Sequence, residues 1–325
     1  MISNKKGLVF GALAGVAFVL AGCGGGSGSS DMTGTTGLLS LGVSDGPVDD
    51  ALKVCIEFSE IEIKGEGPSE VIFLGDPEDP NYEPTRVNLL EFQGNNAQPI
   101  LTSHELPAGE YQWMRLGINA DRGGNGGVGD SGAGVECEVG GSYIIKEDGL
   151  PYNLYVPSSA NNGLKLVGGI TVPANRSVSL TAEFDLRKSI TAPPGLDPDV
   201  VMRPTIRLVN NIEVGTLTGQ VANDLVMADG CAPFVYVFDD GVTPNGIEDL
   251  VDDHEDPVAT AMLEEQPQDD GSVQYHYTIG FLLAGDYEVA FTCNNADFEP
   301  ADGEPATIVV GELETVDIEA PPPTP

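Results

Sequence analysis

The sequence predicts an all-β protein made of two tandem β-sandwich domains, which follow a lipoprotein signal peptide and a flexible tether. Apolar and polar residues alternate with a period of two in most of the patterned segments. The chain contains 42 glycines and 24 prolines, and clusters of Gly, Pro, Asn and Asp separate these segments as turns. No strand–helix–strand rhythm, which a parallel α/β sheet would require, is present.

The first series of strands lies before residue 210. It comprises LLSLGVS (38–44), VCIEF (54–58), WMRLGI (113–118), VSLTAEFDL (178–186) and TIRLV (205–209). After VCIEF the alternation continues out of phase at Ile61 and Ile63. An extra residue in one strand produces such a phase change, so a bulge or turn is predicted near Ser59 and Glu60.

A domain boundary is predicted near residues 211–215, NIEVG. A second series of strands follows it: GTLTGQV, FVYVFDD, VQYHYTIGFLL, YEVAFTC and ATIVVGELETVDIEA. The predicted domains are therefore 35–212 and 213–320, with a proline-rich tail at 321–325. LPAGEYQWMRLGI (106–118) is echoed by LLAGDYEVAFTC (282–293), which favours two sandwiches of similar design.

The N-terminus has the pattern of an export signal. Two lysines precede GLVFGALAGVAFVLAG (7–22), which is apolar, uncharged and shorter than the roughly 20 residues of a comfortable membrane span. The segment ends in Leu20-Ala21-Gly22-Cys23, which resembles a bacterial lipobox. We expect residues 1–22 to be a signal peptide, Cys23 to be acylated, and residues 23–34 to form a Gly/Ser tether. Gly24, where an Asp would suggest inner-membrane retention, favours the outer membrane.

Composition limits the range of partners. The chain has 14 Lys and Arg against 51 Asp and Glu, a formal charge of −37. Removal of residues 1–22 would leave 12 basic residues and a charge of −39. Nucleic acid and anionic lipid head groups are poor partners for such a surface. Solubility and salt tolerance explain the acidity without a specific cationic ligand.

The cysteines suggest one disulfide in each predicted domain. Apart from Cys23, the chain has Cys55, Cys137, Cys231 and Cys293, two in each half. In an exported chain this even number predicts the pairs Cys55–Cys137 and Cys231–Cys293. Four free buried thiols are the alternative, because spacing alone does not establish contact.

Five blocks of the first half resemble a family of bacterial lipoprotein domains catalogued as a domain of unknown function. The blocks are LSLGVSDGPVDDALKVCIEFSEIEI, VNLLEFQG, LPAGEYQWMRLGI, GLKLVGGITVPANRSVSLTAEFDLRKSI and RPTIRLV, within roughly residues 35–212. The resemblance implies no activity, but it supports the lipobox assignment. Residues 214–325 more loosely resemble prealbumin-like or carboxypeptidase-regulatory-like sandwiches. That class overlaps structurally with starch-binding domains, but likeness of fold does not carry sugar binding.

No catalytic set is predicted. GVSDG (42–46) matches a nucleophile-elbow pattern around Ser44, but it lies in an all-β context without the required helix. GNGGVG (124–129) matches a dinucleotide-binding pattern, also without a following helix. His104, His254 and His276 lack the spacing of metal ligands. We therefore expect no enzyme activity and no organic cofactor.

One acidic loop is a candidate calcium site. GVTPNGIEDLVDD (241–253) matches the second half of a calcium loop, with Asn245, Asp249 and Asp252 at ligand positions. The first ligand positions hold Gly241 and Thr243 instead of acids. Calcium requires six or more oxygens, so a solvated acidic loop is the alternative, and any affinity should be in the millimolar range.

Two further groups are candidates for ligand binding. Trp113 and Tyr111 are predicted to share the strand face opposite Met114, where an exposed aromatic pair could stack on a sugar. The alternative is a second buried face. Arg187 and Lys188 could hold an anion, or could neutralise nearby carboxylates such as Asp185.

These observations predict a non-enzymatic adhesion or scaffolding lipoprotein of the bacterial outer membrane, attached to the membrane by its lipid. The alternative is a carbohydrate-binding module, with calcium assistance if the acidic loop is complete. The protein or glycan that it binds is not identified by the sequence.

Overall fold

The computed structural model describes residues 35–46, 48, 51–75, 78, 84–120, 137, 140–157, 163–191, 200–228, 230–247 and 256–321. The residues from Thr35 onwards form one compact unit. The predicted signal peptide and tether, with Cys23, lie outside the described residues. The prediction of an all-β protein is confirmed, since the helices are single short turns among many strands.

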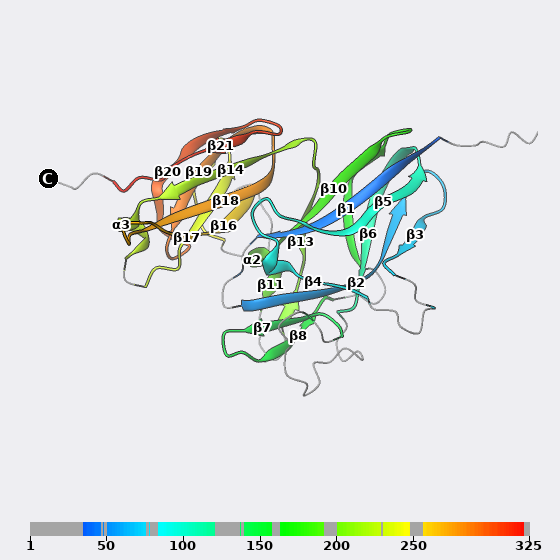
Figure 1. The fold of residues 1–325 in the computed structure, drawn as a ribbon, viewed down its shortest axis with the longest axis horizontal. Coiled ribbons are helices and arrows are strands. Elements are labelled where there is room, and N and C mark those ends of the chain that lie inside the picture. The colour runs from blue at the N-terminus through cyan, green and yellow to red at the C-terminus, as the bar shows by residue number, and fades with distance from the viewer. Residues whose placement is uncertain are drawn as a thin grey trace, which may run out of the picture. The chain divides into compact units, whose positions relative to one another are not determined.

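The N-terminal half (Thr36–Asn210) contains two sheets (Figure 1). Sheet 1 has the order β13 (Thr205–Asn210), β10 (Ser177–Asp185), β1 (Thr36–Gly46), β5 (Gln98–Pro107). Sheet 2 has the order β11 (Ile190–Thr191), β12 (Val200–Met202), β8 (Pro151–Tyr155), β7 (Tyr143–Lys146), β2 (Ala51–Lys64), β6 (Gly109–Ile118), β9 (Leu164–Val172). Strands β3 (Glu70–Phe73) and β4 (Thr85–Asn88) also pair with β2, and η1 (Leu89–Glu91) and α2 (Leu186–Ser189) are short turns.

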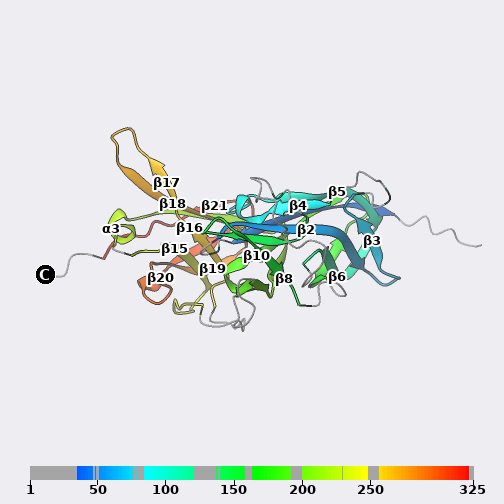
Figure 2. The ribbon, with the colours of Figure 1, turned by 90° about the horizontal axis from the view of Figure 1, so that it is seen from below.

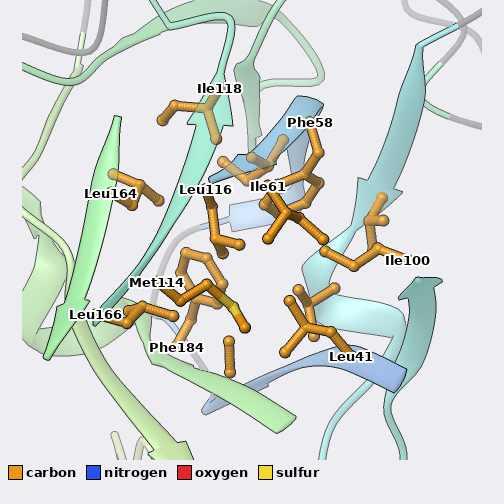
Figure 3. Packing of buried hydrophobic residues seen from close by; sticks show 14 of the residues in the cluster. Leu41, Phe58, Ile61, Ile100, Met114, Leu116, Ile118, Leu164, Leu166 and Phe184 are labelled. Atoms are coloured by element: carbon orange, nitrogen blue, oxygen red, sulfur yellow. The ribbon is translucent and has the colours of Figure 1, made fainter. Parts of the chain in front are cut away.

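Sheets 1 and 2 bury their apolar faces against each other. Figure 3 shows Leu41 and Phe184 of sheet 1 beside Phe58, Met114 and Leu116 of sheet 2. Each of these side chains is almost fully buried, because every second residue of its strand points inward. This sandwich is the largest hydrophobic cluster among the described residues.

The predicted phase change in β2 is confirmed. The pairing of β2 with β6 shifts register between Phe58 and Glu60, as expected for a bulge. Because of this shift, Phe58 and Ile61 both reach the core although three positions separate them.

The C-terminal half (Val214–Thr315) also contains two sheets. Sheet 3 has the order β17 (Glu264–Pro267), β18 (Val273–Leu283), β14 (Val214–Val221), β21 (Leu313–Thr315). Sheet 4 has the order β16 (Ala259–Met262), β15 (Phe234–Asp239), β19 (Gly285–Thr292), β20 (Phe298–Ile308), and α3 (Asn223–Val226) is a single turn. The two sheets enclose a second core, and the β17–β18 hairpin projects from it (Figure 2).

Sheet 4 is covered on its outer face as well. Phe234, Tyr236 and Phe238 alternate with the inward-facing valines of β15 and form an aromatic cluster with Phe298. Residues 242–247 pack over this cluster, so both faces of β15 are buried.

Both halves contain the same corner. Tyr111 donates a hydrogen bond from its hydroxyl to the carbonyl of Pro107 at 2.8 Å, and Tyr287 donates to the carbonyl of Leu283 at 2.9 Å. In each half the Ala-Gly turn leads from a strand of one sheet to a strand of the other, β5 to β6 and β18 to β19. The sequence echo therefore corresponds to a tyrosine that fixes this turn through a backbone carbonyl four residues upstream.

The predicted disulfide pairing is confirmed. Cys55 bonds to Cys137, and Cys231 bonds to Cys293, with Cα–Cα distances of 5.6 and 4.5 Å. Each bridge connects residues of one half only, as predicted. Among the described residues, no helix is long and apolar enough to cross a bilayer.

Candidate functional site

The predicted aromatic pair is separated by the fold. Tyr111 is buried against the N-terminal core, whereas Trp113 lies on the opposite face of sheet 2. The prediction that they share an exposed face is therefore wrong. The reason is a register shift in the pairing of β6 with β9 between Tyr111 and Trp113, opposite Gly168 and Gly169, which changes the phase of the alternation.

Trp113 instead belongs to a mixed polar and apolar surface, which we call the outer face. It consists of the outward side chains of β3, β2, β6 and β9: Val71, Phe73, Glu60, Glu62, Lys64, Trp113, Arg115, Lys165 and Val167. Phe73 is 55% exposed and Val167 is 78% exposed, so apolar surface is left in solvent. The guanidinium of Arg115 lies 4.9 Å and the ammonium of Lys165 lies 5.0 Å from the centre of the Trp113 ring.

The acidic loop can be described only in its first part. Asn245 is placed, whereas Asp249 and Asp252 lie outside the described residues. Asn295 holds this part of the loop over the aromatic cluster, since its side chain accepts from the Ile247 amide and donates to the Ile247 carbonyl, both at 3.1 Å. Gly246 is required there, because a Cβ would lie 1.9 Å from the Asn295 carbonyl. No group of three or more acidic, His or Cys side chains among the described residues is placed to hold a metal.

Ser44 and His104, two residues of the remaining catalytic patterns, make contacts within the fold. The hydroxyl of Ser44 is buried and lies 2.9 and 2.8 Å from the carbonyl oxygens of Phe92 and Asn96, which are acceptors only. His104 lies 3.5 Å from a carboxylate oxygen of Glu70 on β3. His276 is on β18, and the glycine-rich stretch 124–129 and His254 lie outside the described residues.

The cations of α2 contact the C-terminal half. The guanidinium of Arg187 stacks 3.8 Å from the centre of the Phe234 ring and hydrogen-bonds the hydroxyl of Tyr236. The ammonium of Lys188 lies 3.4 Å from the carboxylate of Asp256, and both side chains are almost fully buried. The interpretation that this pair neutralises carboxylates holds. Lys188 pairs with Asp256, and the charges of Lys188 and Arg187 also favour the ionised form of Asp185, whose carboxylate accepts the Lys188 backbone amide.

Beside these contacts lies a cavity of about 300 Å³, which we call the seam cavity. Residues of β10, α2 and β13 form one wall, and residues of β15, β16 and β18–β19 form the other. The side chains that matter for its chemistry are Glu183, Asp185, Lys188, Arg207, Asp239, Asp256 and Thr260. Arg207 pairs with Glu183, and Lys188 pairs with Asp256.

Burial perturbs the carboxylates at this cavity. Burial raises the pKa of Glu183 to about 7, although Arg207 opposes the shift, and it also raises the pKa of Asp185. Asp45, 3% exposed, lies close to both, and burial together with these two neighbours raises its pKa well above the usual range. Neither carboxylate oxygen of Asp45 makes a hydrogen bond of ordinary geometry with a described residue, although the nearby Leu186 amide favours the charged form.

The sequence does not predict this cavity, although two signs of an unusual charge distribution are present in the chain. Asp45 continues the alternation of Leu39, Leu41 and Val43, so the phase alone places it on the inner face. No lysine or arginine follows Arg207, while 25 Asp and Glu residues do. An acidic residue of the C-terminal half can therefore pair with a Lys or Arg only if that residue comes from the N-terminal half.

Comparison with known families identifies the N-terminal half. Residues 36–204, more than half of the chain, match the profile of a domain of unknown function, DUF4382. The chain belongs to this family, and the match confirms the predicted domain of unknown function in the N-terminal half. No curated protein matches the chain.

Solved structures give only distant overlays. The minor pilin GBS52 of Streptococcus agalactiae is 11% identical, with 88% of this chain and 98% of that chain covered and a TM-score of 0.18. A Bacteroides ovatus protein named as a candidate adhesin is 12% identical, with 94% and 95% covered and a TM-score of 0.17. The major pilin of Streptococcus pyogenes is 10% identical, with 88% and 98% covered and a TM-score of 0.15. TM-scores this low do not indicate a shared function, so the pilin and adhesin descriptions apply only to those proteins.

Proposed function

We propose that this protein is a lipid-anchored component of the bacterial cell envelope that acts by binding, as an adhesion or scaffolding module, and not as an enzyme. The observation that carries the binding part is the outer face, where Phe73, Val167 and Trp113 stand on a regular four-strand surface. Apolar side chains exposed on a rigid sheet are typical of a surface that meets a partner. The sequence Leu20-Ala21-Gly22-Cys23 supports the anchor, and Gly24 supports the outer membrane as its location.

Adhesion is tested with the full-length protein coupled to beads and mixed with isolated bacterial cell envelopes. We expect Trp113→Ala to reduce bead retention about tenfold, as truncation of a central aromatic anchor does. The control is Ile212→Ser, which removes an apolar side chain that is 73% exposed in the turn between β13 and β14. Equal retention of both variants and the unmodified protein would remove the outer face from the proposal.

The anchor is tested separately through Cys23. Cys23→Ala should abolish incorporation of labelled palmitate and move the protein from the detergent phase to the aqueous phase, because two or more acyl chains are needed for stable membrane attachment. Label that persists in the variant contradicts lipidation at this residue, whatever the outer face does.

A second candidate function is carbohydrate binding on the same face. The specific observation is the partly exposed ring of Trp113 with the cations of Arg115 and Lys165 over it, which together offer an aromatic surface and N–H donors to a sugar. A glycan array probed with the unmodified protein and with Trp113→Ala distinguishes this function from adhesion to protein. Repeating the array with about 10 mM calcium tests the acidic loop, for which we expect no effect or a millimolar one.

A further inference from the structure

We propose that the outer face binds a second copy of this chain, so that two sandwiches pack face to face through β3, β2, β6 and β9. The inference rests on the proposed binding role of the outer face and names its partner. A two-fold interface uses the same patch of both copies, so such a patch must be complementary to itself. The order of the side chains on the outer face meets this requirement.

The outer face is a surface of this acidic chain on which basic side chains outnumber acidic ones. Lys64, Arg115 and Lys165 stand beside Glu60 and Glu62. The chain after residue 207, by contrast, has 25 acidic residues and no Lys or Arg. Two copies with a formal charge of −37 each approach most favourably where their local charges do not repel. The outer face is therefore suited to a contact between copies, and the C-terminal half is not.

The side chains of the outer face form rows across the sheet. One row begins with Val71 on β3 and Glu62 on β2, and it continues with Arg115 on β6 and Lys165 on β9. The order along the row is therefore apolar, acidic, basic, basic. Within one copy, a guanidinium N–H of Arg115 donates to the carboxylate of Glu62 at 2.7 Å. A guanidinium has five N–H donors and a carboxylate accepts several hydrogen bonds, so both groups can bind a further partner.

The order of this row selects the symmetry axis. An axis parallel to the strands and between β2 and β6 places β2 of one copy over β6 of the other, so Glu62 of each copy meets Arg115 of the other. The same axis places β3 over β9, where Val71 meets the hydrocarbon stem of Lys165. An axis across the strands would place Arg115 on Arg115 and Glu62 on Glu62, and like charges at an interface are unfavourable. The proposed dimer therefore has its axis along the strands.

Exposed apolar surface provides the attraction between the copies. In the proposed dimer, β3 with Val71 and Phe73 covers β9 with Val167, and the contact removes these side chains from water. The neighbouring row holds Lys64 and Trp113, so the Trp113 ring of one copy meets the stem of Lys64 of the other. A few residues on each of four strands make a small interface, so we expect a dissociation constant on the order of 10–100 µM.

The test is sedimentation equilibrium of the full-length purified protein in density-matched detergent with micelles in excess. Protein concentrations from about 5 to about 500 µM bracket the expected dissociation constant. A concentration of about 0.15 M NaCl limits the repulsion between two acidic chains to a range of about 8 Å. We expect a reversible equilibrium between monomer and dimer.

Two charge variants and their mixture locate the interface. Glu62→Arg and Arg115→Glu each place like charges across the proposed interface, so each variant alone should dimerise at least about tenfold more weakly. In an equimolar mixture of the two variants the charges across the interface are opposite at both positions. The mixture should therefore dimerise within about threefold of the unmodified affinity.

The control is Glu265→Arg, which makes the same change of charge on the exposed strand β17 and should dimerise as the unmodified protein does. The pair of Glu62 with Arg115 within one copy is partly exposed, so its loss contributes little to folding. Circular dichroism of each variant verifies that the fold is retained.

Several results would overturn the inference. A protein that stays monomeric up to about 500 µM does not use this face, or any other, to bind itself. A dimer that neither charge variant weakens is formed through another face. Variants that dimerise weakly alone and also in the mixture show that Glu62 of one copy does not meet Arg115 of the other.

The bead assay separates this inference from the proposed binding function. Envelopes from cells that lack this protein offer no second copy, so retention that depends on Trp113 should be lost on them. Retention that persists there and is still reduced by Trp113→Ala would support binding by the outer face and overturn the second copy as its partner.

Discussion

The two halves of the molecule share a construction and differ in charge. Each has two packed sheets, one disulfide and one corner fixed by a tyrosine hydroxyl on a carbonyl four residues upstream. The N-terminal half carries every lysine and arginine found after residue 6, and the C-terminal half carries none. A sandwich can therefore be built from alternating apolar residues and backbone hydrogen bonds without internal Lys or Arg ion pairs. Among the described residues, Arg187 and Lys188 of α2 make a hydrogen bond and an ion pair to the C-terminal half.

The largest expected effect that sharpens this comparison comes from the disulfides. The bridges close segments of 82 and 62 residues, so removing either should lower the free energy of unfolding by about 4 kcal/mol. We expect Cys55→Ala with Cys137→Ala to cost more than Cys231→Ala with Cys293→Ala, because Cys55 is completely buried and its truncation leaves a gap in the core. Urea denaturation of the two double variants measures the difference, and an equal or reversed order would contradict it.

The next effect concerns the contact between the halves. Lys188→Met removes the ammonium that pairs with the almost fully buried carboxylate of Asp256, which should cost about 3 kcal/mol in urea denaturation. The exposed Lys165 provides the control, and Lys165→Met should change stability by less than about 0.5 kcal/mol. If Asp256→Leu added to Lys188→Met restores no stability, the loss does not come from breaking this ion pair.

The features that the sequence predicted well depend on one strand or one pair of adjacent strands. The bulge after Phe58 follows from local alternation, and the cysteine pairs follow from two cysteines in each half, whereas the hydrogen bonds of the tyrosine corners were not predicted. The exposure of Tyr111 was predicted wrongly, because the register shift arises opposite Gly168 and Gly169 of a neighbouring strand. A pair of glycines within a strand pattern is a usable sign of such a bulge.

The seam cavity required long-range information. Its charged residues come from α2, β10, β13 and β15 and from the segment before β16, and no local pattern indicates that these segments meet. The phase of Asp45 and the absence of Lys and Arg after Arg207 show that charge is unusual here, but they do not locate the cavity.

A change of pH should alter the free energy of unfolding less than the Lys188 variant does, and it acts through Glu183 of the N-terminal half. In the folded chain burial raises the pKa of Glu183 from 4.5 to about 7, so between these values the folded state holds a proton that the unfolded state has released. The resulting stabilisation is complete below pH 4.5 and is lost as the pH rises through 7. Between pH 5 and pH 8 the unmodified protein should lose about 2 kcal/mol more than Glu183→Gln. Parallel stability curves for the two proteins would contradict this assignment.

The smallest effect tests whether the two corners are equivalent. Tyr111→Phe and Tyr287→Phe each remove one hydroxyl that donates to a backbone carbonyl, and each should cost about 1 kcal/mol. Thermal or urea denaturation of both variants gives the comparison. If only one corner contributes, the sequence echo reflects similar turns and not a shared stabilising contact.

The distribution of basic residues also determines where trypsin-like proteases can cleave the chain. An enzyme that cleaves after Lys or Arg has no site beyond Arg207, so a complete digest leaves residues 208–325 as one piece of 118 residues, closed by the Cys231–Cys293 bridge. Arg207 itself lies within β13, which is paired with β10, and the fold must open locally before this bond is accessible. Reagents specific for the lysine side chain likewise modify no residue of the C-terminal half. In a compartment with trypsin-like enzymes, the C-terminal half is therefore resistant by composition, before its folding is considered.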